Sequence, residues 1–179
     1  MRVQGVVGAV LLAVGLTTAG LAPADATPAS GFAAEGRAAG LSAAQIAAVQ
    51  IEADGYLADL GGRQVALNRI ELEGATITIA VPGGSRLAPD PNCDGGIDPK
   101  HFCAYRKPGY TGTNIDMFAC GVYDIPESWV GPGSWFNNQT KGTVAEMLND
   151  AGKVIHYTRP APYGDPNGNW TPVDRVRNC

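Results

Sequence analysis

The sequence has few charged residues, only two histidines and no cluster of basic side chains. Charged residues make up 17% of the 179 residues, against roughly 25% in an average soluble domain. Nucleic acids and anionic membranes are bound through clustered positive charge, and a chain of net charge −4 without a Lys/Arg run offers none. His101 and His156 leave little material for acid–base or metal chemistry. These absences argue against nucleic-acid and membrane partners.

Motifs for catalysis are also lacking. Ser128 and Ser134 have no Gly-x-Ser-x-Gly context of a nucleophile elbow. The cysteines form no C-x-x-C pair, and no histidine stands at metal-ligand spacing from them. The carboxylates Asp116, Asp124, Glu127 and Glu146 are scattered along the chain. Acidic residues of a β domain are usually solvated surface groups. We therefore expect a protein that is not an enzyme and has no metal or other cofactor.

The first residues have the features of a secretory signal peptide. Arg2 precedes an apolar run over residues 6–16, and Ala24-Asp25-Ala26 has the small-x-small pattern of a cleavage site. The alternative is a transmembrane anchor, but the run contains glycines and is shorter than the about 20 apolar residues that span a bilayer. We predict a signal peptide over residues 1–26 and a secreted, extracellular mature protein that is free of the membrane.

The four cysteines fit export into an oxidising compartment. Cys93, Cys103, Cys120 and Cys179 are even in number, which in such a compartment predicts two disulfides. Four cysteines allow three pairings. We favour Cys93–Cys103, which closes a short loop, and Cys120–Cys179, which ties the last residue to the middle of the chain. Each disulfide is expected to contribute about 2–4 kcal/mol, the second more because its loop is longer.

Ahead of the cysteines, the chain divides into three segments. Residues 27–40 are small and polar to neutral, and we expect them to be flexible. Residues 41–84 predict a helix that begins at Ser42 and ends at Gly61-Gly62, followed by strands at 65–72 and 75–81. This helix–strand–strand segment is too small to be stable alone, so it either packs on the next domain or is a removed pro-segment. Residues 85–92 form a linker.

Residues 93–179 contain every cysteine and every tryptophan. Short strand-like runs cover residues 102–105, 114–118, 143–148, 153–158 and 173–176, separated by Gly, Pro, Asn and Asp. No stretch supports a long amphipathic helix. Regular short strands of this kind are typical of an all-β sandwich or barrel.

An aromatic motif occurs twice in this domain. Two aromatic side chains can pack across a folded hairpin, and a glycine beyond them suits a positive φ. The residues are Tyr105, Tyr110 and Gly112 in the first copy, and Tyr157, Tyr163 and Gly164 in a looser second copy. The motif resembles the Greek-key signature of βγ-crystallins.

The wider sequence is similar to the actinobacterial family of secreted metalloproteinase inhibitors, small βγ-crystallin-like proteins with two disulfides. The similarity covers residues 56–179 and includes Cys93, residues 102–105, residues 135–143 and Trp170. It implies a mainly β fold: a βγ-crystallin-like double Greek-key sandwich over residues 93–179, preceded by the helix–strand–strand segment. It further implies a monomer whose partner is an extracellular protease.

The sequence differs from this family in several loop and turn segments. Residues between Cys93 and Cys103 form an Asp-rich insertion. The calcium motif of the fold begins at residues 137–142 and 149–154 but fails in its last positions. Asp165-Pro-Asn167-Gly-Asn169 resembles the start of an EF-hand loop but has no Glu at the twelfth position. We interpret residues 165–169 as a turn and expect no calcium there.

An inhibitor must present a loop that a protease accepts but cannot release, so the loop has to be exposed and held at both ends. Residues 120–136 fit this requirement best, because they begin at a predicted disulfide and carry several apolar side chains. Thermolysin-like enzymes favour a bulky apolar residue after the scissile bond. The candidate inhibitory residues are therefore Gly121, Val122, Tyr123, Trp129 and Val130.

A different function class is an extracellular structural or ligand-binding module without inhibitory activity. Exposed aromatic side chains can stack on sugar rings. The tryptophans Trp129, Trp135 and Trp170 are the candidates, with core packing as the alternative. Their burial distinguishes the two interpretations.

Overall fold

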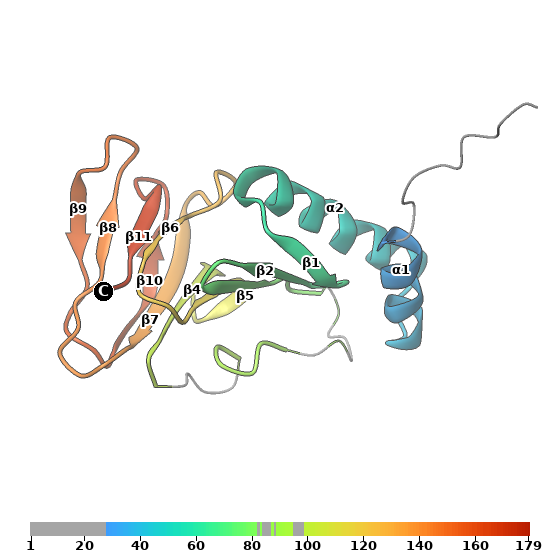
Figure 1. The fold of residues 1–179 in the computed structure, drawn as a ribbon, viewed down its shortest axis with the longest axis horizontal. Helices are drawn as coiled ribbons and strands as arrows, with labels where there is room; N and C mark the ends of the chain where they lie inside the picture. The colour runs from blue at the N-terminus through green and yellow to red at the C-terminus, as the bar shows by residue number, and fades with distance from the viewer. Residues whose placement is uncertain (1–27, 82, 84–86, 88, 95–98) are drawn as a thin grey trace, which may run out of the picture.

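The computed structural model describes residues 28–81, 83, 87, 89–94 and 99–179. The predicted signal peptide and part of the predicted linker lie outside these residues. The described chain is mainly β, with two helices and two antiparallel sheets. The helices lie at one end of the molecule and strands β8 (Glu146–Leu148) and β9 (Val154–Tyr157) at the other (Figure 1). None of the described helices is long and apolar enough to cross a membrane.

Helix α1 (Pro28–Ala38) occupies the segment that was expected to be flexible, and that expectation is wrong for these residues. Phe32 and Ala33 pack against the core, and the carboxylate of Glu35 accepts a hydrogen bond from Leu67 N at 2.8 Å. The segment has no strong helix signal of its own. It becomes helical through these tertiary contacts, which sequence composition does not reveal.

Helix α2 (Ala43–Leu60) confirms the predicted helix and both of its ends. Ser42 and Gln45 form a capping box, in which each side chain accepts a hydrogen bond from the other residue's backbone N–H. Gly61 ends the helix with a φ of 71°, a left-handed conformation that favours glycine. Val49, Ala53 and Tyr56 form the buried stripe of the helix.

The predicted strand at 65–72 is in fact a hairpin of β1 (Arg63–Ala66) and β2 (Arg69–Leu72). Leu67 and Asn68 form the turn, and both are buried. A buried leucine in a turn has the sequence pattern of a strand, which explains the error. The next strand, β3 (Ala75–Thr78), is shorter than the predicted 75–81.

The cysteine-containing domain is built from eight further strands. The five predicted runs correspond to strands, while three other strands were not expected. The predicted group is β4 (His101–Lys107), β5 (Thr111–Met117), β8, β9 and β11 (Arg175–Arg177), and the unexpected group is β6 (Val122–Asp124), β7 (Pro132–Asn138) and β10 (Tyr163–Asn169).

Strand β10 replaces the turn that we predicted at residues 165–169, so that interpretation is wrong. It pairs with β7, with an irregularity between Asp165 and Gly168. Both strands contain glycines because aromatic rings lie across them. A Cβ at Gly168 would come within 1.8 Å of the Trp135 ring, and one at Gly133 within 2.0 Å of Trp170. Glycines that make room for rings look like turn residues in the sequence.

The strand order divides these eight strands into two similar runs. In the run β4 to β7, the last strand lies beside the first, and in the run β8 to β11, β11 lies beside β8. The third strands are exchanged, so that β6 pairs with β11 and β10 pairs with β7. In these two sheets the strand orders are β5-β4-β7-β10 and β6-β11-β8-β9. Strands β1-β2-β3 extend the first sheet, because β3 pairs with β5.

Residues from the N-terminal segment and the β strands share one core. The three tryptophans are buried, with exposures of 1–4%, and Trp170 lies between Trp129 and Trp135 with ring centroids 5.7 and 5.8 Å away. The indole N–H of Trp129 donates to the hydroxyl of Tyr56 on α2 at 3.0 Å. Burial raises the pKa of Tyr56 to about 12. The tryptophans are therefore core residues, and the N-terminal segment packs on the domain.

We expect Tyr56→Phe to destabilise the protein by about 1–3 kcal/mol, because it leaves the buried N–H of Trp129 without an acceptor. Tyr157 is 61% exposed, so Tyr157→Phe is a matched control that should stay within about 0.5 kcal/mol of wild type. Urea unfolding followed by tryptophan fluorescence measures both. Equal midpoints for the two variants would show that α2 is not coupled to the β core through this bond.

Candidate functional site

The chain between β5 and β6 forms an exposed apolar segment, which we call the Cys120 loop and define as residues 118–122. Phe118 is 48% exposed and Val122 50% exposed. Ala119 and Cys120 between them are also exposed. The loop therefore presents two large apolar side chains to solvent on either side of Cys120.

The C-terminus holds this loop on both sides of Cys120. The disulfide Cys120–Cys179 makes the covalent link. Asn178, which is fully buried, donates from Nδ2 to Ala119 O at 2.8 Å and accepts at Oδ1 from Gly121 N at 2.9 Å. Its own backbone N–H donates to Gly121 O at 3.1 Å. One buried amide therefore fixes the residues before and after Cys120.

The turn between β2 and β3 holds the loop from the other side. Gly74 O accepts hydrogen bonds from the backbone N–H groups of Phe118 and Ala119, both at 3.1 Å. The hydroxyl of Tyr123 lies 3.0 Å from Gly74 O and 2.8 Å from Ala119 O. A Cβ at Gly74 would come within 2.5 Å of that hydroxyl, and φ there is 74°, so this close approach requires glycine.

Strand β6, which continues the loop, lies at the edge of its sheet. It pairs with β11 on one side, and no described strand pairs with it on the other. An edge strand presents unpaired backbone N–H and C=O groups to another chain. The loop and strand together offer exposed apolar side chains next to free backbone groups, which is the arrangement used in strand addition.

The structure separates the predicted inhibitory residues into two groups. Gly121 and Val122 lie in the exposed loop, and Tyr123 braces it. Trp129 is 2% exposed and bonded to Tyr56, so its prediction as a displayed residue is wrong. Val130 is 71% exposed, but its neighbour is fixed in the core.

Sequence reasoning missed three of the residues that form this site. They are Phe118, Asn178 and Gly74. The position of Asn178 directly before Cys179 was a usable signal once the Cys120–Cys179 pairing was favoured. Nothing in the sequence signals Gly74, because its contact with the loop depends on the register of β3 against β5.

The disulfide pairing in the structure is the one favoured from the sequence, Cys93–Cys103 and Cys120–Cys179. The first aromatic motif also folds as expected. Tyr105 and Tyr110 pack edge to face at 5.7 Å, and Gly112 has a φ of 82°.

The second motif is different. Tyr157 lies exposed on β9 in the smaller sheet, whereas Tyr163 and Gly164 lie on β10 in the larger one. The guanidinium of Arg159 lies over the Tyr163 ring at 5.1 Å. The second copy therefore does not form the same aromatic hairpin.

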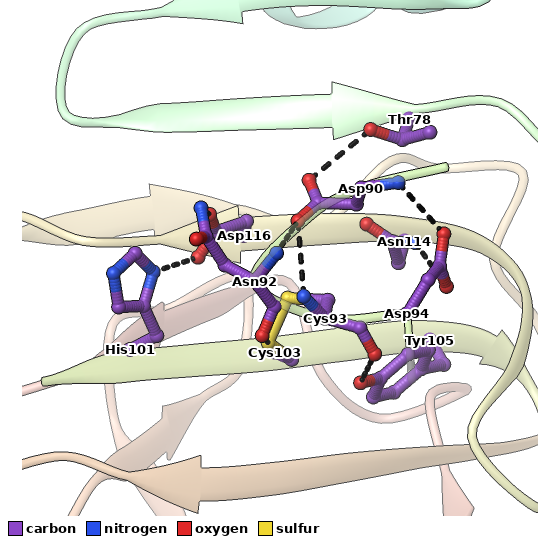
Figure 2. The surroundings of a disulfide bond; sticks show 10 residues. All are labelled: Thr78, Asp90, Asn92, Cys93, Asp94, His101, Cys103, Tyr105, Asn114 and Asp116. Atoms are coloured by element: carbon purple, nitrogen blue, oxygen red, sulfur yellow. Dashed lines mark hydrogen bonds and ion pairs between the residues drawn. A yellow bond between two sulfur atoms is a disulfide. The ribbon is translucent and has the colours of Figure 1, made fainter. Parts of the chain in front are cut away.

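A buried polar cluster surrounds the Cys93–Cys103 disulfide (Figure 2). Alternation along β5 sends Ile115 and Met117 into the hydrophobic core, and Asn114 and Asp116 to the opposite face. Both polar residues are nevertheless only 1% exposed. The cover comes from residues 90–94, the segment that leads into the disulfide.

Asp116 has a side-chain partner at each of its carboxylate oxygens. Nδ1 of His101 lies 2.5 Å from one carboxylate oxygen, and Asn92 Nδ2 donates to the other at 2.8 Å. Burial raises the pKa of Asp116, while the bonds from His101 and Asn92 oppose that rise. The nearby cysteines are joined in a disulfide, so neither supplies a thiolate to a metal or a reaction.

A groove of about 840 Å³ lies between the two sheets on the far side of the molecule from α1. Asp150, Asp165 and Asp174 line it together with His156, whose ring meets Trp135 edge-on at 5.6 Å. Because Trp135 is 4% exposed, its ring offers no open platform for a sugar. The buried tryptophans therefore do not support a carbohydrate-binding module, which would need exposed rings to stack on sugars.

Comparisons with known proteins name no relative: no protein-family model, no curated protein and no solved structure matches the chain. The geometry of the Cys120 loop and the order of the strands therefore carry the information on function.

We expect Asn178→Ala to loosen the Cys120 loop, because it removes the amide that bonds to Ala119 and Gly121. Limited digestion with a broad-specificity serine protease, followed by mass spectrometry, should then show faster cleavage within residues 118–122. Asn167→Ala, at an exposed position, is the matched control and should be cut like wild type. Unchanged cleavage of the Asn178 variant would contradict the clamp.

Proposed function

We propose that the mature chain is a secreted inhibitor of an extracellular metalloprotease and that the Cys120 loop is the segment the enzyme meets. The single observation that carries the proposal is the double restraint of this loop by Asn178 and Cys179 on one side and Gly74 on the other. If a protease cut the Gly121–Val122 bond, both new ends would stay in place.

The restraint matters because an inhibitor and a substrate behave differently once the bond is cut. A free loop gains conformational entropy when it is cut, and its ends separate. A loop whose two sides are fixed gains little, so release of the cleaved form is slow and resynthesis of the bond is favoured. Ala119 and Gly121 are fixed by hydrogen bonds, and Val122 is already part of β6.

The proposal extends to the fold, which we assign to the βγ-crystallin-like double Greek keys. The return of β7 to β4 and of β11 to β8 supports this assignment, because in a Greek key the fourth strand comes back to lie beside the first. The third strand of each run pairs in the sheet of the other run, which would link the two keys. The first aromatic motif supports this assignment through the Tyr105–Tyr110 contact. The second motif supports it less, because its aromatic residues lie in different sheets.

A metalloprotease is the favoured target class because of the side chain that comes after Gly121. Thermolysin-like enzymes take a bulky apolar residue on the leaving side of the bond, and Val122 is half exposed there. Phe118 supplies a second apolar contact before the bond. The edge position of β6 lets the enzyme pair with the inhibitor backbone.

The test is a titration of a thermolysin-like metalloprotease and of a subtilisin-like serine protease with the oxidised mature protein. We expect stoichiometric loss of the metalloprotease activity. Val122→Asp should abolish this inhibition without unfolding the protein, because the side chain is exposed and a charge opposes an apolar pocket.

Val130→Asp is the matched control, since Val130 is more exposed and lies outside the loop. It should inhibit like wild type. Inhibition that is lost in the Val130 variant and kept in the Val122 variant would assign the contact to residues 129–130 instead. Absence of inhibition of both proteases by a folded, uncut protein would overturn the proposal in favour of a binding or structural module.

A further inference from the structure

Part of the buried polar cluster has the composition of a cation site that the proposed function does not use. Thr78 on β3 and Asn114 on β5 are directly opposite each other in the sheet, so their side chains lie on the same face about 5 Å apart at Cβ. Both are buried, with exposures of 4% and 1%. A cavity of about 260 Å³ is lined by these two residues and Asp94.

The amide oxygen of Asn114 lacks a partner. Its Nδ2 donates to Asp94 Oδ1 at 3.2 Å, but Oδ1 is buried and has no hydrogen-bond donor among the described residues. An unsatisfied buried acceptor costs about 1–3 kcal/mol. Turning the amide over does not help, because it would place this oxygen against the carboxylate of Asp94. The group therefore needs a positive or donating partner on the side of the cavity.

The charge around the cavity is negative, from Asp90 and Asp94. None of the ion pairs between described residues joins Asp90 or Asp94 to a lysine or arginine. Asp90, which is 1% exposed, accepts from Asn92 N at 2.7 Å, Cys93 N at 3.0 Å and Thr78 Oγ1 at 3.2 Å. A buried charge such as Asp90 is paired or coordinates a metal, whereas Asp94 is exposed and reaches the cavity from its solvent side.

The elements that bring these groups together are distant in the sequence. Figure 2 shows Thr78, Asp90, Asp94 and Asn114 grouped on the side of the cluster away from His101. Asp94 Oδ2 accepts from Asp90 N at 2.9 Å, which fixes the carboxylate at the start of the disulfide loop. The loop, β3 and β5 each contribute one oxygen-bearing side chain to the cavity.

We propose that this cavity binds a Ca²⁺ ion through the carboxylate of Asp94, Oδ1 of Asn114 and Oγ1 of Thr78. Asp90 is a positioning residue, since it holds the hydroxyl of Thr78 by accepting its hydrogen bond. Ca²⁺ takes six to eight oxygen ligands in flexible geometry, and waters complete the shell. The ion fastens the Cys93–Cys103 loop to both strands. This site is separate from the Asn- and Asp-rich turns considered in the sequence.

The experiment uses the oxidised mature protein after treatment with a chelator and dialysis. Calorimetric titration with CaCl2 should show saturable binding, and the melting temperature should rise with the Ca²⁺ concentration by linkage. MgCl2 at equal concentration should give a smaller rise, because Mg²⁺ demands a smaller, octahedral site. No heat of binding and no rise at millimolar CaCl2 would overturn the proposal.

Variants locate the ion. Asp94→Asn should lose the Ca²⁺-dependent rise, whereas Asp150→Asn, at an exposed position in the other sheet's turn, should keep it. Asn114→Asp should be less stable than wild type without Ca²⁺ and bind it at least as tightly, because it adds a carboxylate ligand. A full Ca²⁺ response in Asp94→Asn, or loss of binding in a folded Asn114→Asp protein, would place the ion elsewhere. Neither outcome depends on inhibition of a protease.

Discussion

The antiparallel pairing of β3 with β5 is the contact on which both sites depend. It joins the N-terminal segment to the cysteine-containing domain through four residue pairs, from Ala75–Met117 to Thr78–Asn114. At one end of β3, this register places Gly74 O against the backbone of Phe118 and Ala119. At the other end, it sets Thr78 opposite Asn114. A shift by one residue would turn every side chain of β3 to the other face and separate both sets of groups.

The two disulfides act on different parts of this arrangement. Cys93–Cys103 spans 10 residues and holds a polar segment over a sheet face that carries Asn114 and Asp116. Cys120–Cys179 spans 59 residues and removes more conformational entropy from the unfolded chain. It also places Asn178 where its amide reaches both sides of Cys120. The shorter bond covers buried polar groups, and the longer one restrains an exposed loop.

Local signals predicted the parts of the fold that depend on neighbouring residues. Ser42 and Gly61 marked both ends of α2, and cysteine spacing favoured the observed pairing. Helix α1 was missed because its stability comes from contacts with Leu67 and Ile46 rather than from its own sequence. Strands β7 and β10 were missed because glycine signals a turn locally, whereas here it makes room for tryptophan rings across the sheet.

The candidate site was predicted only in part for the same reason. Val122 was identified because its apolar character next to a cysteine is visible in the sequence. Trp129 was misplaced because the alternation of apolar residues does not distinguish a displayed ring from one bonded to Tyr56 on a distant helix. The role of Asn178 depends on a disulfide across 59 residues, and that of Gly74 on strand register. Both roles depend on tertiary structure, which the local sequence around these residues does not reveal.

The same contacts bear on whether residues 41–84 are a dispensable leader. Their removal would expose the edge of β5 and leave its backbone groups unpaired. It would also take away the acceptor of the Trp129 N–H and the carbonyl that binds Phe118 and Ala119. Such a cut would remove hydrogen bonds that hold the Cys120 loop, the segment through which the proposed inhibitor acts. The contacts therefore favour a functional unit in which the helix–strand–strand segment stays attached to the domain.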